Sequence, residues 1–295
     1  MTALDRLAVV RRDVPLGPLT TYKLGGPASF YAEVQSRAEL DQVLEAWRST
    51  DLPLLVLGRG SNLVVADDGI DALVLRLAGT FGLVMHEPDA VWAGAAVRLP
   101  QLARAAVGEG RLGLEFYVGI PGSVGGAVRQ NAGGHGRETR DVLVTATVLD
   151  GREGSVTSRT GVDLELSYRH SSLTPNEVVT DARFRFEKGD PSEGEARMRE
   201  ITRWRKEYQP GGTLNAGSVF KNPADDSAGR IIDSLGLKGM AVGDVSVSDK
   251  HANFFVAGPN ATASDLYRLV AEVRAIVADR TGVELETEIQ FEGFA

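Results

Sequence analysis

The sequence predicts an α+β protein of several lobes, and three observations support this. Residues 30–75 alternate apolar, strand-like runs with one amphipathic helix. From Ala90 onward, short strands alternate with glycine-rich loops around one helix. The segment Lys188-Gly189-Asp190-Pro191 is the strongest boundary signal in the chain. A length of 295 residues, 43% of them hydrophobic, fits two or three lobes with cores of their own.

The elements of the first lobe follow from the apolar periodicity. Ser36 and Glu39 form a capping box, and the apolar residues that follow share one face of a helix that ends near Ser49. Continuous apolar runs predict strands that are buried on both faces. Such strands are expected at residues 54–57, 63–66 and 72–75, and residues 30–34 are expected to form a further strand. Strand, helix and strand in this order predict a small parallel unit.

Caps and apolar stripes predict the later elements as well. Ser192 with Glu195 forms a second capping box, and Ser264 is expected to cap the last helix. The elements expected are a helix at 100–108, strands at 142–149 and 178–186, a basic helix at 192–208, and a helix from 264 to Gly282.

Composition excludes several classes of protein. Lys plus Arg is 32 against 40 Asp plus Glu, a net charge of −8 without a basic run, so we expect no nucleic-acid partner. Cys is absent, and His86, His135, His170 and His251 lie too far apart for a metal motif. No apolar stretch approaches about 20 residues, and residues 1–16 are charged, unlike a signal peptide. We expect a soluble, cytoplasmic monomer with neither a metal nor a membrane partner.

Two glycine-rich loops are the candidate ligand site. They are Gly58-Arg59-Gly60-Ser61-Asn62 and Gly119-Ile120-Pro121-Gly122-Ser123-Val124-Gly125-Gly126. Such loops expose backbone amides that favour phosphate, although glycines also build simple tight turns. The first loop leads into a strand and neither loop has a P-loop lysine, so the Rossmann and P-loop patterns do not fit. We therefore expect a nucleotide pyrophosphate between two loops, without a helix N-terminus.

Further motifs follow these loops in a fixed order. They are Asn131-Ala132-Gly133, Tyr168-Arg169-His170-Ser171, Gln209-Pro210, residues 215–223, residues 236–239, Lys250-His251-Ala252 and Leu285-Glu286-Thr287-Glu288. Together with the glycine loops, they resemble the UDP-N-acetylenolpyruvoylglucosamine reductase (MurB) family of bacterial peptidoglycan synthesis. The resemblance spans residues 20–293.

The resemblance implies a two-lobed FAD-binding domain of the vanillyl-alcohol-oxidase (PCMH) type, followed by a smaller α/β substrate-binding lobe. It implies an N-terminal extension over 1–21, the FAD-binding domain over 22–189 with lobes at about 22–79 and 80–189, and the substrate-binding domain over 190–295. The interval 223–235 is short, which resembles the form of the enzyme without an additional tyrosine loop. The absence of Cys, and of His in the Gly58 loop, favours noncovalent FAD.

The resemblance also implies the ligand contacts. For FAD these are Gly58, Arg59, Gly60, Ser61, Asn62, Gly119, Ile120, Pro121, Gly122, Ser123, Gly125, Gly126 and Asn131. For the substrate's UDP diphosphate they are Arg205, Gln209, Lys221, Asn222 and Lys250. His135 stands where the family usually has tyrosine, and we expect it to pack or form a hydrogen bond near the flavin.

The reaction of the family reduces the enolpyruvyl ether of UDP-N-acetylglucosamine enolpyruvate to UDP-N-acetylmuramate, after NADPH has reduced FAD. Hydride delivery leaves negative charge on the adjacent carbon and its carboxylate. Arg169 matches the cation that faces this charge, because a guanidinium stays protonated and offers paired donors. Ser218 matches the proton donor. Alternation alone makes Glu288 an exposed strand residue, whereas the resemblance places it in the site with a raised pKa.

Two alternatives remain open. An FAD-dependent oxidase or dehydrogenase could share this flavin fold and act on another substrate. It would lack the Asn-Ala-Gly-Ser and Leu-Glu-x-Glu motifs, and both are present. A noncatalytic nucleotide-binding module would need only the glycine loops, without convergence of Arg169, Ser218 and Glu288.

Overall fold

The computed structural model describes residues 2–294, and its contacts divide the chain into two compact units. Unit 1 contains the residues up to Arg12, Phe30–Arg59 and Ala72–Trp204, and unit 2 contains Asp13–Ser29, Gly60–Asp71 and the residues from Arg205 on. This division by contacts falls elsewhere than the domain boundaries that the resemblance implies. Residues 60–71 group with the C-terminal residues because β4 (Leu63–Val65) pairs in parallel with β18 (Gln290–Glu292).

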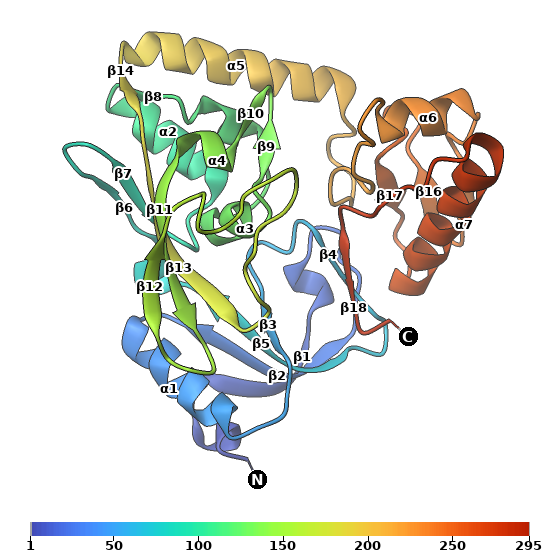
Figure 1. The fold of residues 1–295 in the computed structure, drawn as a ribbon. Helices are drawn as coiled ribbons and strands as arrows, with labels where there is room; N and C mark the ends of the chain where they lie inside the picture. The colour runs from blue at the N-terminus through green and yellow to red at the C-terminus, as the bar shows by residue number, and fades with distance from the viewer. Residues whose placement is uncertain (1, 295) are drawn as a thin grey trace. The chain divides into compact units, whose positions relative to one another are not determined.

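A four-stranded sheet, most of whose residues belong to unit 1, and helix α1 come first in the chain (Figure 1). The strand order is β1 (Val10–Pro15), β2 (Pro27–Val34), β5 (Ile70–Leu77) and β3 (Leu54–Val56). β3 and β5 run parallel, and β5 lies between β2 and β3 in the sheet. In α1 (Arg37–Arg48) the Ser36 hydroxyl accepts a hydrogen bond from the Glu39 amide. The four apolar residues of its stripe, Leu40, Val43, Leu44 and Trp47, are fully buried in the core.

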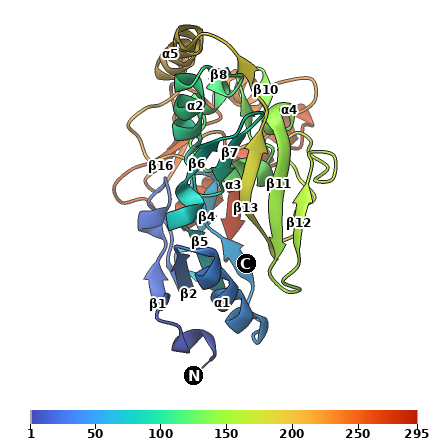
Figure 2. The same ribbon diagram turned by 90° about the vertical axis from the view of Figure 1, so that its left-hand side faces the viewer.

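An antiparallel five-stranded sheet forms the rest of the unit 1 core (Figure 2). Its order is β12 (Val156–Arg159), β11 (Leu143–Asp150), β13 (Glu177–Phe184), β7 (Val91–Gly94) and β6 (Val84–His86). Helix α3 (Val124–Arg129) packs on β13 and β7. The other elements are α2 (Leu99–Gly108), α4 (Thr139–Val142), and the strand pairs β8 (Arg111–Leu112) with β14 (Glu187–Lys188) and β9 (Gly133–Gly134) with β10 (Arg137–Glu138). The predicted helix at 100–108 and the strands at 142–149 and 178–186 are confirmed.

Unit 2 packs helices against a small sheet around its own core (Figure 1). The sheet has the order β15 (Ala241–Val242), β16 (Val245–Val247) and β17 (Phe255–Ala257), and the helices are α6 (Ala228–Ser234) and α7 (Ala263–Thr281). α7 ends at Gly282 as predicted, and Gly282 adopts the left-handed conformation. The predicted cap is wrong: Thr262 caps α7 in a capping box with Asp265, while the Ser264 hydroxyl donates to Asp67.

The basic helix forms as predicted, but it begins one residue earlier. Helix α5 (Pro191–Tyr208) has Pro191 in its first turn, so Ser192 already lies inside the helix. The capping box of Ser192 with Glu195 is therefore wrong. The Asp190 carboxylate accepts from the Ser192 amide instead, and this hydrogen bond lowers the pKa of Asp190.

Residues 2–294 contain neither a membrane-spanning helix nor a cluster of metal ligands. No helix in this range is long and apolar enough to cross a membrane. The same range holds no group of three or more His, Asp or Glu side chains arranged to bind a metal ion.

Candidate active site

A pocket in unit 1 lies between the first glycine-rich loop and α3. It encloses about 590 Å³ of empty space, which includes open solvent. Its lining includes Gly58 and Arg59 from the first loop and Ser123, Gly125 and Gly126 from the second. Arg76, Arg129 and Glu177 complete its polar wall, and Val56, Leu57, Leu77, Ala95, Ala96 and Val179 line the rest. Five of the predicted cofactor contacts therefore share one cavity.

The pocket lacks side chains where the two loops approach each other. A Cβ on Gly58 would lie 2.7 Å from the Ser123 hydroxyl oxygen, and one on Gly125 would lie 3.1 Å from the Cβ of Ala95. Both distances are shorter than ordinary contacts, so a side chain at either position would require its neighbour to shift. The backbone at both positions stays accessible to a ligand as a result.

Arginines give this pocket its positive charge. Burial and the nearby charges of Arg98 and Arg76 lower the pKa of Arg59. Arg76 also forms an ion pair with Glu33 at 3.3 Å, which offsets part of its charge. Cations beside exposed backbone amides suit a diphosphate. The apolar, amide and arginine groups of this lining therefore fit a dinucleotide such as FAD.

Residues 60–62 of the first loop belong to unit 2 and do not line the pocket. Gly60 has φ +59, and its carbonyl accepts from the Thr21 amide at 3.0 Å. The Asn62 amide nitrogen donates to the Glu288 carbonyl at 2.8 Å. Direct cofactor contacts of Gly60, Ser61 and Asn62 stay predictions.

The second loop leads directly into a helix. Ser123 caps α3, accepting from the Gly126 amide. The prediction of a site built without any helix start is therefore wrong for this loop, because Gly125 and Gly126 lie in the first turn of α3. Gly119, Ile120, Pro121 and Gly122 lie outside the lining of the pocket, so their cofactor contacts stay predictions.

Asn131 is fully buried just beyond α3. Its amide nitrogen donates to Glu138 and to the Ser167 carbonyl, and its amide oxygen accepts from the Arg140 backbone. The side chain therefore holds protein groups together. A direct contact of Asn131 with the cofactor stays a prediction.

Arg169 lies in a tight turn of unit 1. An antiparallel bridge joins Ser167 to His170, and Arg169 between them has φ +53, a left-handed conformation that is uncommon for residues other than glycine. Its guanidinium donates to the Gly133 carbonyl at 3.2 Å and lies 5.0 Å from the centroid of the Tyr168 ring. The side chain is half-buried.

His135 contacts Trp204 near the C-terminal end of α5. The two ring centroids are 5.1 Å apart and the ring planes are nearly perpendicular. His135 also has φ +54, on the exposed connection between β9 and β10. Aromatic rings favour this edge-to-face arrangement, so the geometry is consistent with a packing role for His135.

Ser218 lies in unit 2 on an irregular strand held by Asn253. The Val219 amide donates to the Asn253 carbonyl at 2.8 Å. The Asn253 side chain then accepts from the Phe220 amide at 2.9 Å and donates to the Phe220 carbonyl at 2.8 Å. Next to Ser218, Gly217 has φ +80, and a Cβ built there would meet no atom within 4 Å. The half-buried Ser218 is thus fixed in position beside open space.

The Glu288 segment pairs with the Ser218 segment in the same unit. The Glu288 amide donates to the Val219 carbonyl at 2.8 Å, and Phe220 forms a bridge with Thr287. Only residues 290–292 of this region form a regular strand. Alternation predicts an exposed Glu288, whereas the structure makes it half-buried. Its raised pKa stays a prediction.

The predicted diphosphate contacts are basic and amide groups of unit 2, and each already has a protein partner. Arg205 donates to Gln209 at 2.7 Å, Lys221 pairs with Glu286 at 3.1 Å, Lys250 donates to the Lys206 carbonyl at 2.7 Å, and Asn222 accepts from the Ala228 amide at 3.1 Å. Burial lowers the pKa of Arg205. Lys221 lies three residues beyond Ser218.

The sequence motifs missed several residues that shape the site. Arg76, Arg98 and Glu177 have no motif of their own, since a single charged residue on or near a strand carries no local signal. Asn253 follows the Lys250-His251-Ala252 motif directly, and an asparagine next to the apolar run that follows it could have indicated a backbone-pairing role.

Two protein-family models match the chain. An FAD binding domain matches residues 28–159, and the C-terminal domain of UDP-N-acetylenolpyruvoylglucosamine reductase matches residues 209–292. The UDP-N-acetylenolpyruvoylglucosamine reductase of Rhodopseudomonas palustris is 42% identical over 95% of this chain and 90% of its own length. That of Acidiphilium cryptum is 42% identical over 94% of this chain and 89% of its own length.

A solved structure agrees with these matches. The crystal structure of the UDP-N-acetylenolpyruvylglucosamine reductase (MurB) from Thermus caldophilus superposes with a TM-score of 0.83 at 39% identity, covering 96% of this chain and 99% of that one. The fold and pocket thus define an FAD-dependent oxidoreductase, and the predicted PCMH-type domain with a C-terminal α/β lobe is confirmed. The chain belongs to the UDP-N-acetylenolpyruvoylglucosamine reductase family.

Proposed function

We propose that the protein reduces UDP-N-acetylglucosamine enolpyruvate to UDP-N-acetylmuramate in peptidoglycan synthesis, with NADPH as the hydride donor. The observation that carries this proposal is 42% identity to named reductases over 95% of the chain. We further propose that it acts as a monomer in the cytoplasm, without nucleic-acid or membrane partners.

FAD fits the unit 1 pocket, where Gly58, Arg59, Ser123, Gly125 and Gly126 would hold it. When bound, FAD would supply the redox chemistry by accepting a hydride from NADPH and passing one to the terminal carbon of the enolpyruvyl group. The side chains must then supply one proton and stabilise charge. The amides of the loops would orient the diphosphate, with Arg59 offsetting its charge.

We assign catalytic roles to three residues. The Ser218 hydroxyl donates the proton to the carbon next to the substrate carboxylate. The Arg169 guanidinium stabilises the negative charge that forms on that carbon and carboxylate, because its paired donors match a carboxylate. Glu288 acts as a hydrogen-bonding acid toward the same group.

A spectroscopic experiment tests the proposed function. The purified protein should be yellow, NADPH should bleach it, and UDP-N-acetylglucosamine enolpyruvate should restore the colour without oxygen. After acid precipitation the colour should remain in the supernatant, because the Gly58 loop lacks an attachment residue. Flavin that stays with the precipitate would contradict noncovalent binding. Rapid NADPH turnover with oxygen as the sole acceptor would favour the oxidase alternative.

His135 should act by packing and not as the acid. His135→Phe can keep the edge-on contact with Trp204, so we expect the pH profile of reoxidation by the enolpyruvyl substrate to keep its shape. His135→Ala loses that contact and should cost about 1 kcal/mol of unfolding free energy. Stopped-flow reoxidation from pH 5 to 9 measures the profile. Disappearance of one limb in His135→Phe would assign the acid to His135.

A further inference from the structure

The loop that carries Arg169 has a backbone that its surroundings must hold in place. It connects β12 to β13, and both Glu165 and Arg169 have positive φ values, +48 and +53. Such conformations persist in non-glycine residues only where neighbouring contacts enforce them. Leu164, Leu166 and Leu173 pack into the core, but the Arg169 turn itself is exposed on both sides at Tyr168 and His170. Polar contacts must therefore fix the turn.

Arg129, the last residue of α3, supplies most of these contacts. One terminal guanidinium nitrogen donates to the Leu173 carbonyl at 3.3 Å. The other donates to the carbonyls of Thr174 and Glu177 at 3.1 and 2.6 Å. The Arg129 carbonyl in turn accepts from the Ser171 hydroxyl at 2.6 Å. One residue thus takes part in four hydrogen bonds with the segment that follows the Arg169 turn.

Ser167 and Arg169, in the turn itself, form hydrogen bonds with residues just beyond Arg129. Asn131 donates to the Ser167 carbonyl at 2.8 Å, and Arg169 donates to the Gly133 carbonyl. The turn is therefore held on both sides by the chain that leaves α3. This arrangement makes its position depend on the end of a short helix and not on the loop's own sequence.

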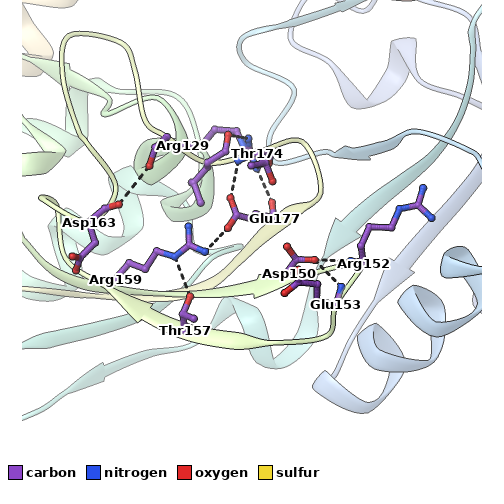
Figure 3. Close-up of polar contacts among 11 residues, drawn as sticks. Arg129, Asp150, Arg152, Glu153, Thr157, Arg159, Asp163, Thr174 and Glu177 are labelled. Atoms are coloured by element: carbon purple, nitrogen blue, oxygen red, sulfur yellow. Dashed lines mark hydrogen bonds and ion pairs between the residues drawn. The ribbon is translucent and has the colours of Figure 1, made fainter.

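A buried carboxylate, Glu177, lies beside the contacts of Arg129 and holds the same loop. The buried Glu177 carboxylate accepts from the Thr174 amide at 2.7 Å and forms an ion pair with Arg159 (Figure 3). Glu177 thus ties the end of the loop to its start, while Arg129 binds the backbone carbonyls. The half-buried Arg129 guanidinium donates to three backbone carbonyls, and a lysine cannot reproduce its planar fork.

Arg129 also lines the cofactor pocket. It shares that lining with Glu177 and with Ser123, Gly125 and Gly126, which lie at or near the start of α3. Helix α3 therefore begins at the glycine-rich loop and ends at the support of the Arg169 turn. We propose that Arg129 is a positioning residue that fixes the place of the Arg169 turn relative to the cofactor pocket. This proposal rests on the function proposed above.

Arg129→Lys in the full-length, FAD-loaded protein tests this proposal. FAD affinity and the rate of bleaching by NADPH should change by less than about threefold. Reoxidation by the enolpyruvyl substrate should slow by about 10- to 100-fold, since a small misplacement of a catalytic group can cost that much. In an Arg169→Ala background, Arg129→Lys should slow reoxidation by less than about twofold, because it acts through Arg169.

Arg152→Lys is the matched control. Arg152 also donates to backbone carbonyls, those of Thr50 and Leu52, and it packs on the Trp47 ring, without touching the Arg169 loop. The variant Arg152→Lys should therefore be bleached by NADPH and reoxidised by the enolpyruvyl substrate at the parent rates. If Arg129→Lys does not fold, Ser171→Ala removes a single hydrogen bond of the same set and should slow reoxidation severalfold.

The outcomes separate this proposal from the proposed function. A parent protein that is never reoxidised by the enolpyruvyl substrate overturns the function itself. A parent that is reoxidised, with Arg129→Lys or Ser171→Ala reacting at the parent rate, overturns only the role of Arg129. Additive effects of Arg129→Lys and Arg169→Ala, or loss of FAD from Arg129→Lys, would likewise assign Arg129 to general stability or to cofactor binding.

Discussion

Ser218→Ala should leave a folded, yellow protein that NADPH bleaches at the parent rate and that the enolpyruvyl substrate reoxidises about a hundred- to ten-thousand-fold more slowly. The two half-reactions differ because only the second needs a proton on carbon, and loss of a general acid typically costs this much. The substitution removes one hydroxyl and no backbone contact, so the unfolding free energy should change by only about 1 kcal/mol. Anaerobic stopped-flow absorbance of the flavin measures both steps.

The geometry around Ser218 makes this a sharp test. The hydrogen bonds that hold its strand come from the Val219 and Phe220 backbone and from Asn253, and none of these uses the Ser218 hydroxyl. Ser234→Ala is a matched control, because Ser234 lies in the same unit and its hydroxyl donates only to the Ile231 carbonyl within α6. Reoxidation of Ser218→Ala at the parent rate would remove Ser218 as the proton donor.

The regular elements could be predicted because their signals are local. The helix at 37–48 follows from a cap and a stripe of apolar residues, and all four residues of that stripe are buried. The caps of α5 and α7 were misassigned because serine, threonine and aspartate compete at neighbouring positions. In both helices the residue two positions before the predicted cap, Asp190 or Thr262, accepts the hydrogen bond.

Long-range pairing could not be predicted from local patterns. The apolar run at 63–65 is a strand as expected, but it pairs with residues 290–292, more than two hundred positions away. That pairing moves part of the glycine-rich segment into unit 2, and it brings Asn62 to the Glu288 carbonyl. The pattern of apolar residues in each segment predicts a strand but does not indicate which strand it pairs with.

Some residues of the candidate site could likewise be predicted from the sequence, and others could not. Some glycines of the site, such as Gly58, stand where an added Cβ would lie close to a neighbouring side chain. These glycines could be found in the sequence because glycines are unusually dense in their loops. The charges of Arg76 and Arg98, and the backbone contacts of Arg129, depend on where other elements fold. The motifs therefore include residues that line the pocket, such as Gly58, and residues such as Asn131 that hold other parts of the chain in place.

Arg169→Ala should slow reoxidation by the enolpyruvyl substrate by about a hundred- to a thousandfold, with little change in bleaching by NADPH. A preorganised donor that faces developing negative charge is typically worth this much. The Ser218 hydroxyl remains in Arg169→Ala, so the loss arises from charge stabilisation and not from the proton. Arg169→Lys keeps the charge but loses the paired donors, and we expect an intermediate loss of about tenfold.

The pH profile distinguishes this role from simple loss of structure. Arg169 donates a hydrogen bond to the Gly133 carbonyl, and loss of such a hydrogen bond should lower the unfolding free energy by about 1 kcal/mol. Arg183→Ala provides a matched control, since Arg183 forms a partly exposed ion pair with Glu87 in the same unit and should react at the parent rate. If charge stabilisation is lost, reoxidation should slow by a similar factor at every pH from 6 to 9, because a guanidinium stays protonated throughout. A loss confined to one end of that range, or an Arg169→Lys rate equal to the parent's, would show that the paired donors of Arg169 do not face the charge that forms during reduction.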